Sequence, residues 1–142
     1  MRALLDVNVL IALLDSDHVH HATAHAWLEN NIGTGWASCP LTQNGCIRIM
    51  SQPAYPGCLP ASAVAQRLRA ATATTWHAFW PDSISLVDEG LVDWSGVLGS
   101  RQVTDVYLLG LAVRNAGRFA TFDRSVPRHA VTGAGERHLA VI

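Results

Sequence analysis

Apolar residues recur along the chain with two alternating periods, and this pattern predicts strands that alternate with helices. Short apolar runs typical of buried strands occur at residues 2–5, 36–39, 84–87, 118–122 and 138–142. Between them, the spacing predicts helices at residues 9–14, 21–29, 40–50, 61–73 and 104–116, with a shorter one within 91–98. This alternation is typical of a mostly parallel sheet covered on both faces, so we predict an α/β fold with three layers (α/β/α) and about five strands.

Turn-forming residues separate these elements. Asn8 is a natural N-cap for the helix that follows the first strand, and Asn115 and Gly117 supply stop signals for the last helix. A proline-rich stretch at residues 51–60 reads as a loop. No internal repeat or linker interrupts the pattern, and we therefore predict one domain over residues 1–142.

Composition narrows the class of protein. With 49% hydrophobic and 15% charged residues, the chain has the make-up of a packed globule, and a net charge of −1 means that a nucleic acid would have to bind a local patch. The cysteines Cys39, Cys46 and Cys58 form no C-x-x-C pair and suit reduced thiols. The apolar run Val9–Leu14 is far shorter than the ~20 residues of a membrane span. We expect a soluble cytoplasmic protein without a membrane partner.

Three aspartates stand at the boundaries of the most apolar elements. Asp6 ends the first strand, Asp123 ends the strand at 118–122, and Asp105 opens the helix at 104–116. An ion removed from water is costly unless it is paired, so Asp6 either caps the following helix or belongs to a site. Because ligands bind at the carboxyl ends of parallel strands, all three carboxylates could meet at one edge of the sheet.

Converging carboxylates repel one another and need a counter-charge. Mg²⁺ supplies it best, with Mn²⁺ as a second choice, since both are hard cations that prefer oxygen ligands. A cation of this kind suits hydrolysis of a nucleic-acid backbone. Taken singly, however, Asp105 is more simply a helix cap, and Asp123 could equally be a turn residue.

At these residues the chain resembles the PIN-domain family, and more narrowly the VapC-type toxins of bacterial toxin–antitoxin pairs. The resemblance covers essentially the whole chain. The segments that carry it are residues 4–10 (LLDVNVL), 18–21 (HVHH), 26–28 (AWL), 40–49 (PLTQNGCIRI), 104–105 (TD) and 121–124 (TFDR). It implies a Mg²⁺-dependent endoribonuclease on a five-stranded parallel sheet, usually a homodimer. It also implies inhibition by a cognate VapB-type antitoxin, through which alone DNA would be contacted.

Position by position, the resemblance implies that Asp6, Asp105 and Asp123 are catalytic metal ligands. Thr121 matches a small hydroxyl residue beside them, and Asn8 matches a polar residue that bonds the first carboxylate or caps the helix. The chain departs from the family pattern at Gln43, where a glutamate is usual. Gln43 retains a carbonyl oxygen but lacks the charge. This departure keeps open a second hypothesis, a catalytically weakened module that binds RNA or antitoxin. A third, weaker one is a DNA-directed 5′ nuclease.

Basic and aromatic residues suggest further contacts. Arg48 and Arg124, together with Arg128, flank the expected site in sequence and could position phosphate, or could simply be solvated. The remaining candidates are two clusters. His18, His20, His21 and His25 contain an i, i+4 pair with the spacing of a zinc site, although a solvent-facing helix start is the simpler interpretation. Trp76, His77, Phe79 and Trp80 could stack on RNA bases, but we favour packing.

Overall fold

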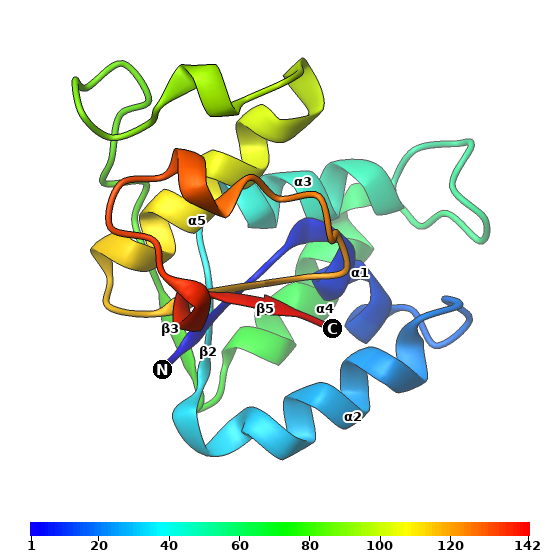
Figure 1. Ribbon diagram of the computed structural model, residues 1–142. Helices are drawn as coiled ribbons and strands as arrows, with labels where there is room; N and C mark the ends of the chain where they lie inside the picture. The colour runs from blue at the N-terminus through cyan, green and yellow to red at the C-terminus, as the bar shows by residue number, and fades with distance from the viewer.

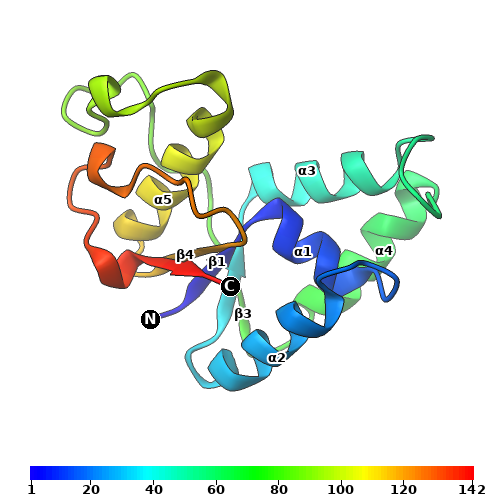
Figure 2. The same ribbon diagram turned by 45° about the vertical axis from the view of Figure 1, so that its right-hand side comes forward.

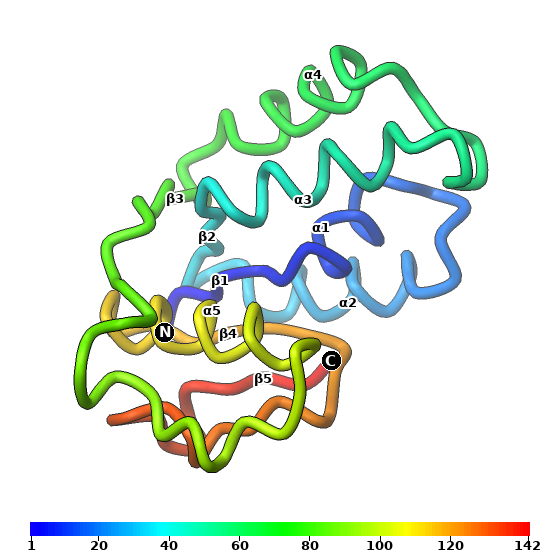
Figure 3. The backbone as a smooth tube through the Cα atoms, turned by 90° about the horizontal axis from the view of Figure 1, so that it is seen from above, coloured from blue at the N-terminus to red at the C-terminus, as the bar shows by residue number.

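A sheet of five short parallel strands lies at the centre of the computed structural model, which describes residues 1–142. The strands are β1 (Ala3–Leu5), β2 (Trp36–Ser38), β3 (His77–Phe79), β4 (Arg118–Thr121) and β5 (Leu139–Val141). Their order across the sheet is β3-β2-β1-β4-β5, which the labels follow down Figure 3, and every pairing is parallel. The predicted parallel sheet is confirmed.

Helices cover both faces of this sheet. They are α1 (Val7–Leu14), α2 (His21–Asn31), α3 (Pro40–Met50), α4 (Ala61–Thr72) and α5 (Val103–Arg114), with the 3₁₀ turns η1 (Ile32–Thr34), η2 (Trp94–Gly96), η3 (Ser100–Gln102), η4 (Arg128–Ala130) and η5 (Glu136–His138). Figures 1 and 2 show α5 on one side of the sheet and α1 to α4 on the other. The three-layer α/β/α fold is thus confirmed. The helix expected within 91–98 is reduced to the single turn η2. None of the helices is both long and apolar enough to cross a membrane.

Alternating side chains of the strands build two separate cores. Leu4 and Phe119 point toward α5 and belong to one buried cluster, whereas Leu5 and Ala120 point toward α1 and belong to the other. Successive residues of a strand face opposite sides of a sheet, so each short strand contributes to both layers. Since both faces are buried, the strands read as continuous apolar runs in the sequence.

The third strand was predicted in the wrong place. We expected it at residues 84–87, but β3 is His77–Phe79, which pairs with β2 at the edge of the sheet. Ile84 and Leu86 are partly buried against the α5 cluster from an irregular segment. Their apolar character therefore reflects packing on a helix and not a ladder of backbone hydrogen bonds.

The histidine pair of α2 is bonded to the C-terminal end of α1. His21 Nδ1 lies 2.7 Å from the carbonyl oxygen of Ala12, and His25 Nε2 lies 3.3 Å from that of Leu13. A carbonyl oxygen only accepts, so each ring nitrogen donates. The last carbonyls of a helix lack partners within the helix. The four-residue spacing thus serves to join α1 and α2.

The strand order places a topological switch point between β1 and β4. From β1 the chain proceeds to β2 and β3 on one side, then returns to β4 and β5 on the other. In open parallel sheets the crevice outside the carboxyl ends of the strands at such a point is where ligands bind. The residues that follow β1 and β4, Asp6 and the segment after Thr121, lie there.

Candidate active site

Asp6 is buried at the switch point, with 8% of its surface exposed. One carboxylate oxygen, Oδ1, accepts a hydrogen bond of 2.7 Å from the backbone N–H of Val7 and caps α1. The other, Oδ2, accepts one of 2.7 Å from the Thr121 hydroxyl. The prediction that Asn8 caps this helix was wrong, because α1 begins at Val7 and Asn8 is an exposed residue of its first turn. Asp6 is thus both cap and candidate ligand.

Thr121 connects two of the three aspartates. Its fully buried hydroxyl donates to Asp6 and accepts a hydrogen bond of 3.0 Å from the backbone N–H of Asp123. Thr121 ends β4, which pairs directly with β1. The hydroxyl therefore fixes the orientation of the Asp6 carboxylate and the start of the chain segment that carries Asp123.

Asp105 completes the acidic group from the first turn of α5. Burial, together with the charges of Asp6 and Asp123, raises the pKa of Asp105 to about 7. Burial also raises the pKa of Asp6, aided by the charge of Asp123, although the hydrogen bonds from Thr121 and Val7 act in the opposite direction. The three carboxyls are thus close enough to affect one another's protonation.

Asp123 is held differently from its two neighbours. It is exposed, and its Oδ1 accepts hydrogen bonds from the Ser125 hydroxyl at 2.6 Å and the Ser125 backbone N–H at 2.7 Å. These bonds lower the pKa of Asp123. No three His, Cys, Asp or Glu side chains of the structure converge as a ready-made metal-binding group. The structure brings the aspartates to one edge of the sheet without closing them around a common point.

The donor chemistry at this edge fits a hard divalent cation. Burial, Asp6 and Asp123 all raise the pKa of Asp105, and no positive group lowers it. This carboxyl therefore has like-charged neighbours without a compensating cation. Carboxylate oxygens are the ligands that Mg²⁺ and Mn²⁺ prefer. A bound cation would relieve the repulsion that the fold imposes.

Gln43 makes its hydrogen bond away from the aspartates. Its amide nitrogen donates to the Ser38 hydroxyl at 2.9 Å, and that hydroxyl lies 2.8 Å from Nε2 of His77. Gln43 also lines a pocket between α3 and α4 with Arg69 and Thr72. The side chain that departs from the family pattern therefore ties α3 to the end of β2 and, through the Ser38 hydroxyl, to the start of β3.

Comparison with known proteins decides the family. No protein-family profile matches the chain. Ribonuclease VapC44 of Mycobacterium tuberculosis is 51% identical over 142 residues, which is 100% of both chains. Ribonuclease VapC39 of the same organism is 44% identical over 138 residues, 96% of this chain and 99% of the relative. Ribonuclease VapC38 is 42% identical over 125 residues, 87% of this chain and 86% of the relative.

The chain belongs to the VapC-type ribonucleases of the PIN-domain family. The resemblance seen in the sequence is thereby confirmed over its full length, and it agrees with the parallel three-layer fold.

The remaining candidate residues of this VapC-family chain lie around the acidic edge or away from it. Arg124 is exposed next to Asp123, whereas Arg48 is exposed on the last turn of α3, about 12 Å along that helix from its start. Trp80 is buried in the α5 core, as expected for packing, whereas Trp76 and Phe79 are about half exposed.

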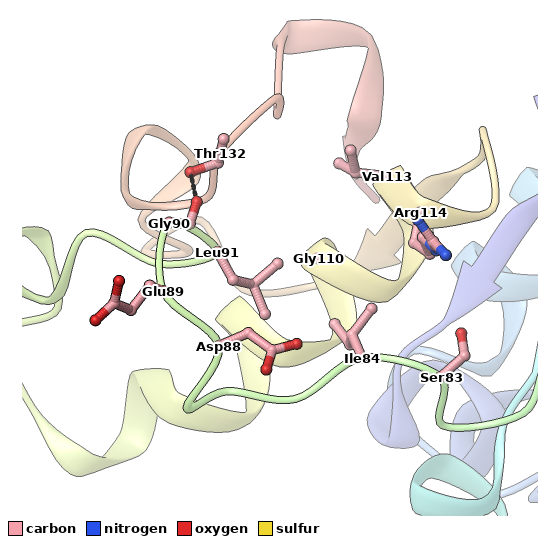
Figure 4. Close-up of a pocket in the computed structure, with 10 residues that line it drawn as sticks. All are labelled: Ser83, Ile84, Asp88, Glu89, Gly90, Leu91, Gly110, Val113, Arg114 and Thr132. Carbon is pink, nitrogen blue, oxygen red and sulfur yellow. Dashed lines mark hydrogen bonds between the residues drawn. The ribbon is translucent and has the colours of Figure 1, made fainter.

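The largest cavity is not the acidic edge. It encloses about 420 Å³ between the second half of α5 and the segment at residues 83–91, and Figure 4 shows its lining. Arg114, Asp88 and Thr132 contribute polar groups, and the Thr132 hydroxyl donates to the carbonyl of Gly90. None of the three aspartates lines it. The three aspartates therefore lie outside this cavity.

Sequence reasoning missed Ser125, which orients Asp123. A signal was available, because an aspartate followed two residues later by serine commonly forms a side-chain turn. Asp93 and Ser95 make the same pair of bonds elsewhere in the chain. The spacing by itself therefore indicates a turn, and only the position of Asp123 after β4 marks it as part of the site.

Proposed function

We propose that this VapC-family chain is a Mg²⁺-dependent endoribonuclease toxin that hydrolyses RNA phosphodiester bonds. The observation that carries the proposal is the position of Asp6, Asp105 and Asp123 at the switch-point edge of the sheet, where burial and the charges of Asp6 and Asp123 raise the pKa of Asp105 to about 7. Carboxylates gathered at the switch point of a sheet, with like charges that raise the pKa of Asp6 and Asp105, are typical of a cation site. The names of the relatives, all ribonucleases, support RNA as the substrate.

In this proposal Asp6, Asp105 and Asp123 hold Mg²⁺ or Mn²⁺, and Thr121 orients Asp6. When bound, the cation supplies a counter-charge to the carboxylates and polarises the phosphodiester. Arg124, exposed beside Asp123, contacts the RNA backbone. Asn8 and Gln43 serve supporting roles, and Arg48, exposed on α3, contacts RNA phosphate as Arg124 does.

A catalytically weakened binding module is the less supported alternative. It rests on the missing charge at Gln43, but the Gln43 amide is bonded to Ser38 and not to an aspartate. The three aspartates at the switch point are all present. The fold therefore retains the acidic group on which turnover would depend.

The first test is metal-dependent cleavage by the purified chain. We expect it to cut total bacterial RNA at defined sites in Mg²⁺ or Mn²⁺, to stop with a chelator, and to resume when Mg²⁺ is added back. The measurement is sequencing of the new 5′ ends, with Na⁺ at matched ionic strength as the control. Cleavage that persists unchanged in the chelator would contradict the proposal.

A cognate VapB-type antitoxin and a homodimer complete the proposal, with cytoplasmic RNA as the target. Expression of the chain should arrest growth, and co-expression of the neighbouring short gene should restore it. Light scattering of the purified chain gives the oligomeric state directly. Growth that is unaffected by the chain alone argues against a toxin.

Thr121→Val should weaken the response to metal without abolishing the fold. Valine matches threonine in shape but lacks the hydroxyl that holds Asp6 and receives the Asp123 N–H. Loss of such supporting hydrogen bonds typically costs 10–100-fold in metal affinity or activity. Cleavage rates measured against Mg²⁺ concentration should shift to about tenfold higher Mg²⁺. Thr121→Ser, which keeps the hydroxyl, should stay close to the unsubstituted chain; equal losses in both variants would contradict this role.

A further inference from the structure

A second, smaller pocket opens beside the acidic edge. It encloses about 320 Å³ and is lined by Leu41, Asp82, Leu86, Val103, Thr104 and Tyr107. The first turn of α3 provides one wall, the first turn of α5 a second, and the irregular segment after β3 the third. No part of the proposed metal site lines this pocket, so it is free for another role.

The pocket lies on the same side of the sheet as the aspartates. Leu41 follows the carboxyl end of β2, and Asp82 follows that of β3. Because all strands are parallel, these ends share one edge with Asp6 after β1. Neighbouring strands lie about 4.8 Å apart, so the pocket is on the order of 10 Å from Asp6 across the sheet. Thr104 in its wall directly precedes Asp105.

The lining combines flat apolar walls with a single carboxylate. Tyr107, Leu41 and Leu86 supply aromatic and aliphatic surface. Burial, the charge of Asp82 and hydrogen bonding of the Tyr107 hydroxyl to that carboxylate raise the pKa of Tyr107, and Asp82 also contributes to the raised pKa of Cys39. Each carboxylate oxygen has two lone pairs, so Asp82 can accept further hydrogen bonds. Asp82 therefore sits over this wall, and its side chain remains exposed to incoming groups.

We propose that this pocket receives one unpaired guanine of the RNA substrate, whose Watson–Crick edge donates to Asp82. The inference rests on the proposed function, since it places the base next to the cleavage site. An ionised carboxylate only accepts hydrogen bonds. Guanine presents two adjacent donors on that edge, N1–H and the N2 amino group, which match two carboxylate oxygens.

The other bases fit this pocket less well. Adenine and cytosine each present one amino donor beside a ring nitrogen that accepts. Uracil presents one N–H between two carbonyl groups, which repel a carboxylate. The apolar and aromatic walls accept the faces of all four bases, as is general for unpaired RNA. Discrimination therefore falls to Asp82.

Base preference can be measured without cleavage. Fluorescently labelled six-nucleotide RNAs that contain one guanine, inosine, adenine or cytosine among uridines are titrated with the intact chain in the presence of a chelator. Inosine is guanosine without the N2 amino group of its base. We expect guanine to bind about tenfold more tightly than inosine, since a paired base contact discriminates by this order. Equal affinities for guanine and inosine would overturn the proposal.

Asp82→Asn and Asp88→Asn form a matched pair for the same titration. Both remove one exposed carboxylate of the same irregular stretch, but Asp88 lines the larger cavity, which lies along the second half of α5 and not at its first turn. Asp82→Asn should remove the preference for guanine over inosine, and Asp88→Asn should keep it. A preference retained in Asp82→Asn would assign the effect to another residue and overturn the inference. Thermal melts establish that both variants fold.

The two proposals fail separately. If the chain does not cleave RNA in Mg²⁺, the proposed function is wrong, but the titration still reports whether Asp82 selects guanine. If cleavage occurs at sites with no guanine enrichment near the cut, the function stands and the pocket has another occupant, such as a basic side chain of a protein partner.

Discussion

Asp105→Asn is expected to abolish Mg²⁺-dependent RNA cleavage and, at neutral pH, to stabilise the fold. Asparagine matches the size of aspartate but carries no charge to attract a cation. Changes in residues that only support a metal ligand cost 10–100-fold, so loss of the ligand itself should reduce cleavage by at least about 100-fold. A variant that loses cleavage but gains stability would identify Asp105 as a functional group, because replacing an aspartate with a structural role would lower stability.

The stability gain follows from the direction of the pKa shift. Folding raises the pKa of Asp105 from 3.8 to about 7, so the folded state holds this proton more tightly than the unfolded state. As pH rises from about 4 to 7, Asp105 loses its proton in the unfolded chain but keeps it in the folded chain. The free energy of unfolding therefore falls over this pH range. Asparagine never ionises and escapes this loss. Because the Asp105 carboxyl is partly exposed, solvent screening reduces the effect, and we expect Asp105→Asn to raise the free energy of unfolding by about 1–2 kcal/mol.

The measurement is a pair of thermal melts for each variant, at pH 4 and at pH 8. Asp105→Asn should melt several degrees higher than the unsubstituted chain at pH 8, since about 1 kcal/mol corresponds to roughly 3 °C at this size. The difference should shrink toward zero at pH 4. Asp88→Asn serves as the control and should show no such pH-dependent gain. A destabilised Asp105→Asn at pH 8 would mean that the carboxylate is a structural group with a partner.

Much of the candidate site could be predicted from the sequence, because its residues are defined by their place at the ends of apolar elements. A strand of three or four residues leaves little freedom in where its last side chain lies. Once Asp6 and Asp123 follow neighbouring parallel strands, their proximity is a consequence of the fold. Asp105 required the further fact that α5 begins at the same edge.

What could not be predicted depends on pairings between distant segments. The edge strand β3 forms because His77–Phe79 meet β2, and nothing in its own three residues distinguishes it from a loop. The role of Gln43 depends on Ser38 and His77, which come together only through that pairing. The sequence revealed a missing charge at Gln43 but not the bond that the amide makes instead.

Gly117→Ala is expected to give a large loss of stability, although it adds only one carbon atom. A Cβ at Gly117 would lie 2.5 Å from a ring carbon of Trp80 and 2.6 Å from the carbonyl oxygen of Arg2. That oxygen cannot easily retreat, since it accepts a hydrogen bond of 3.0 Å from Arg118 N–H where β1 and β4 begin to pair. Overpacking of this kind costs about 1–3 kcal/mol, and a shift of both strands places the change at the upper end.

The neighbouring residue should respond in the opposite direction, and the contrast tests the geometry. Ala116 occupies the left-handed region at φ 52°, where α5 ends and Gly117 N–H bonds to Ala112 O. This conformation is unfavourable for alanine and easy for glycine, so Ala116→Gly should stabilise the fold by about 0.5 kcal/mol after the entropy of the unfolded chain is subtracted. Gly33→Ala, with open space around its Cβ, is the control and should change little. Urea unfolding gives all three free energies. If Gly117→Ala falls within about 0.5 kcal/mol of the control, the close contact of Gly117 with β1 and Trp80 does not determine the junction of α5 and β4.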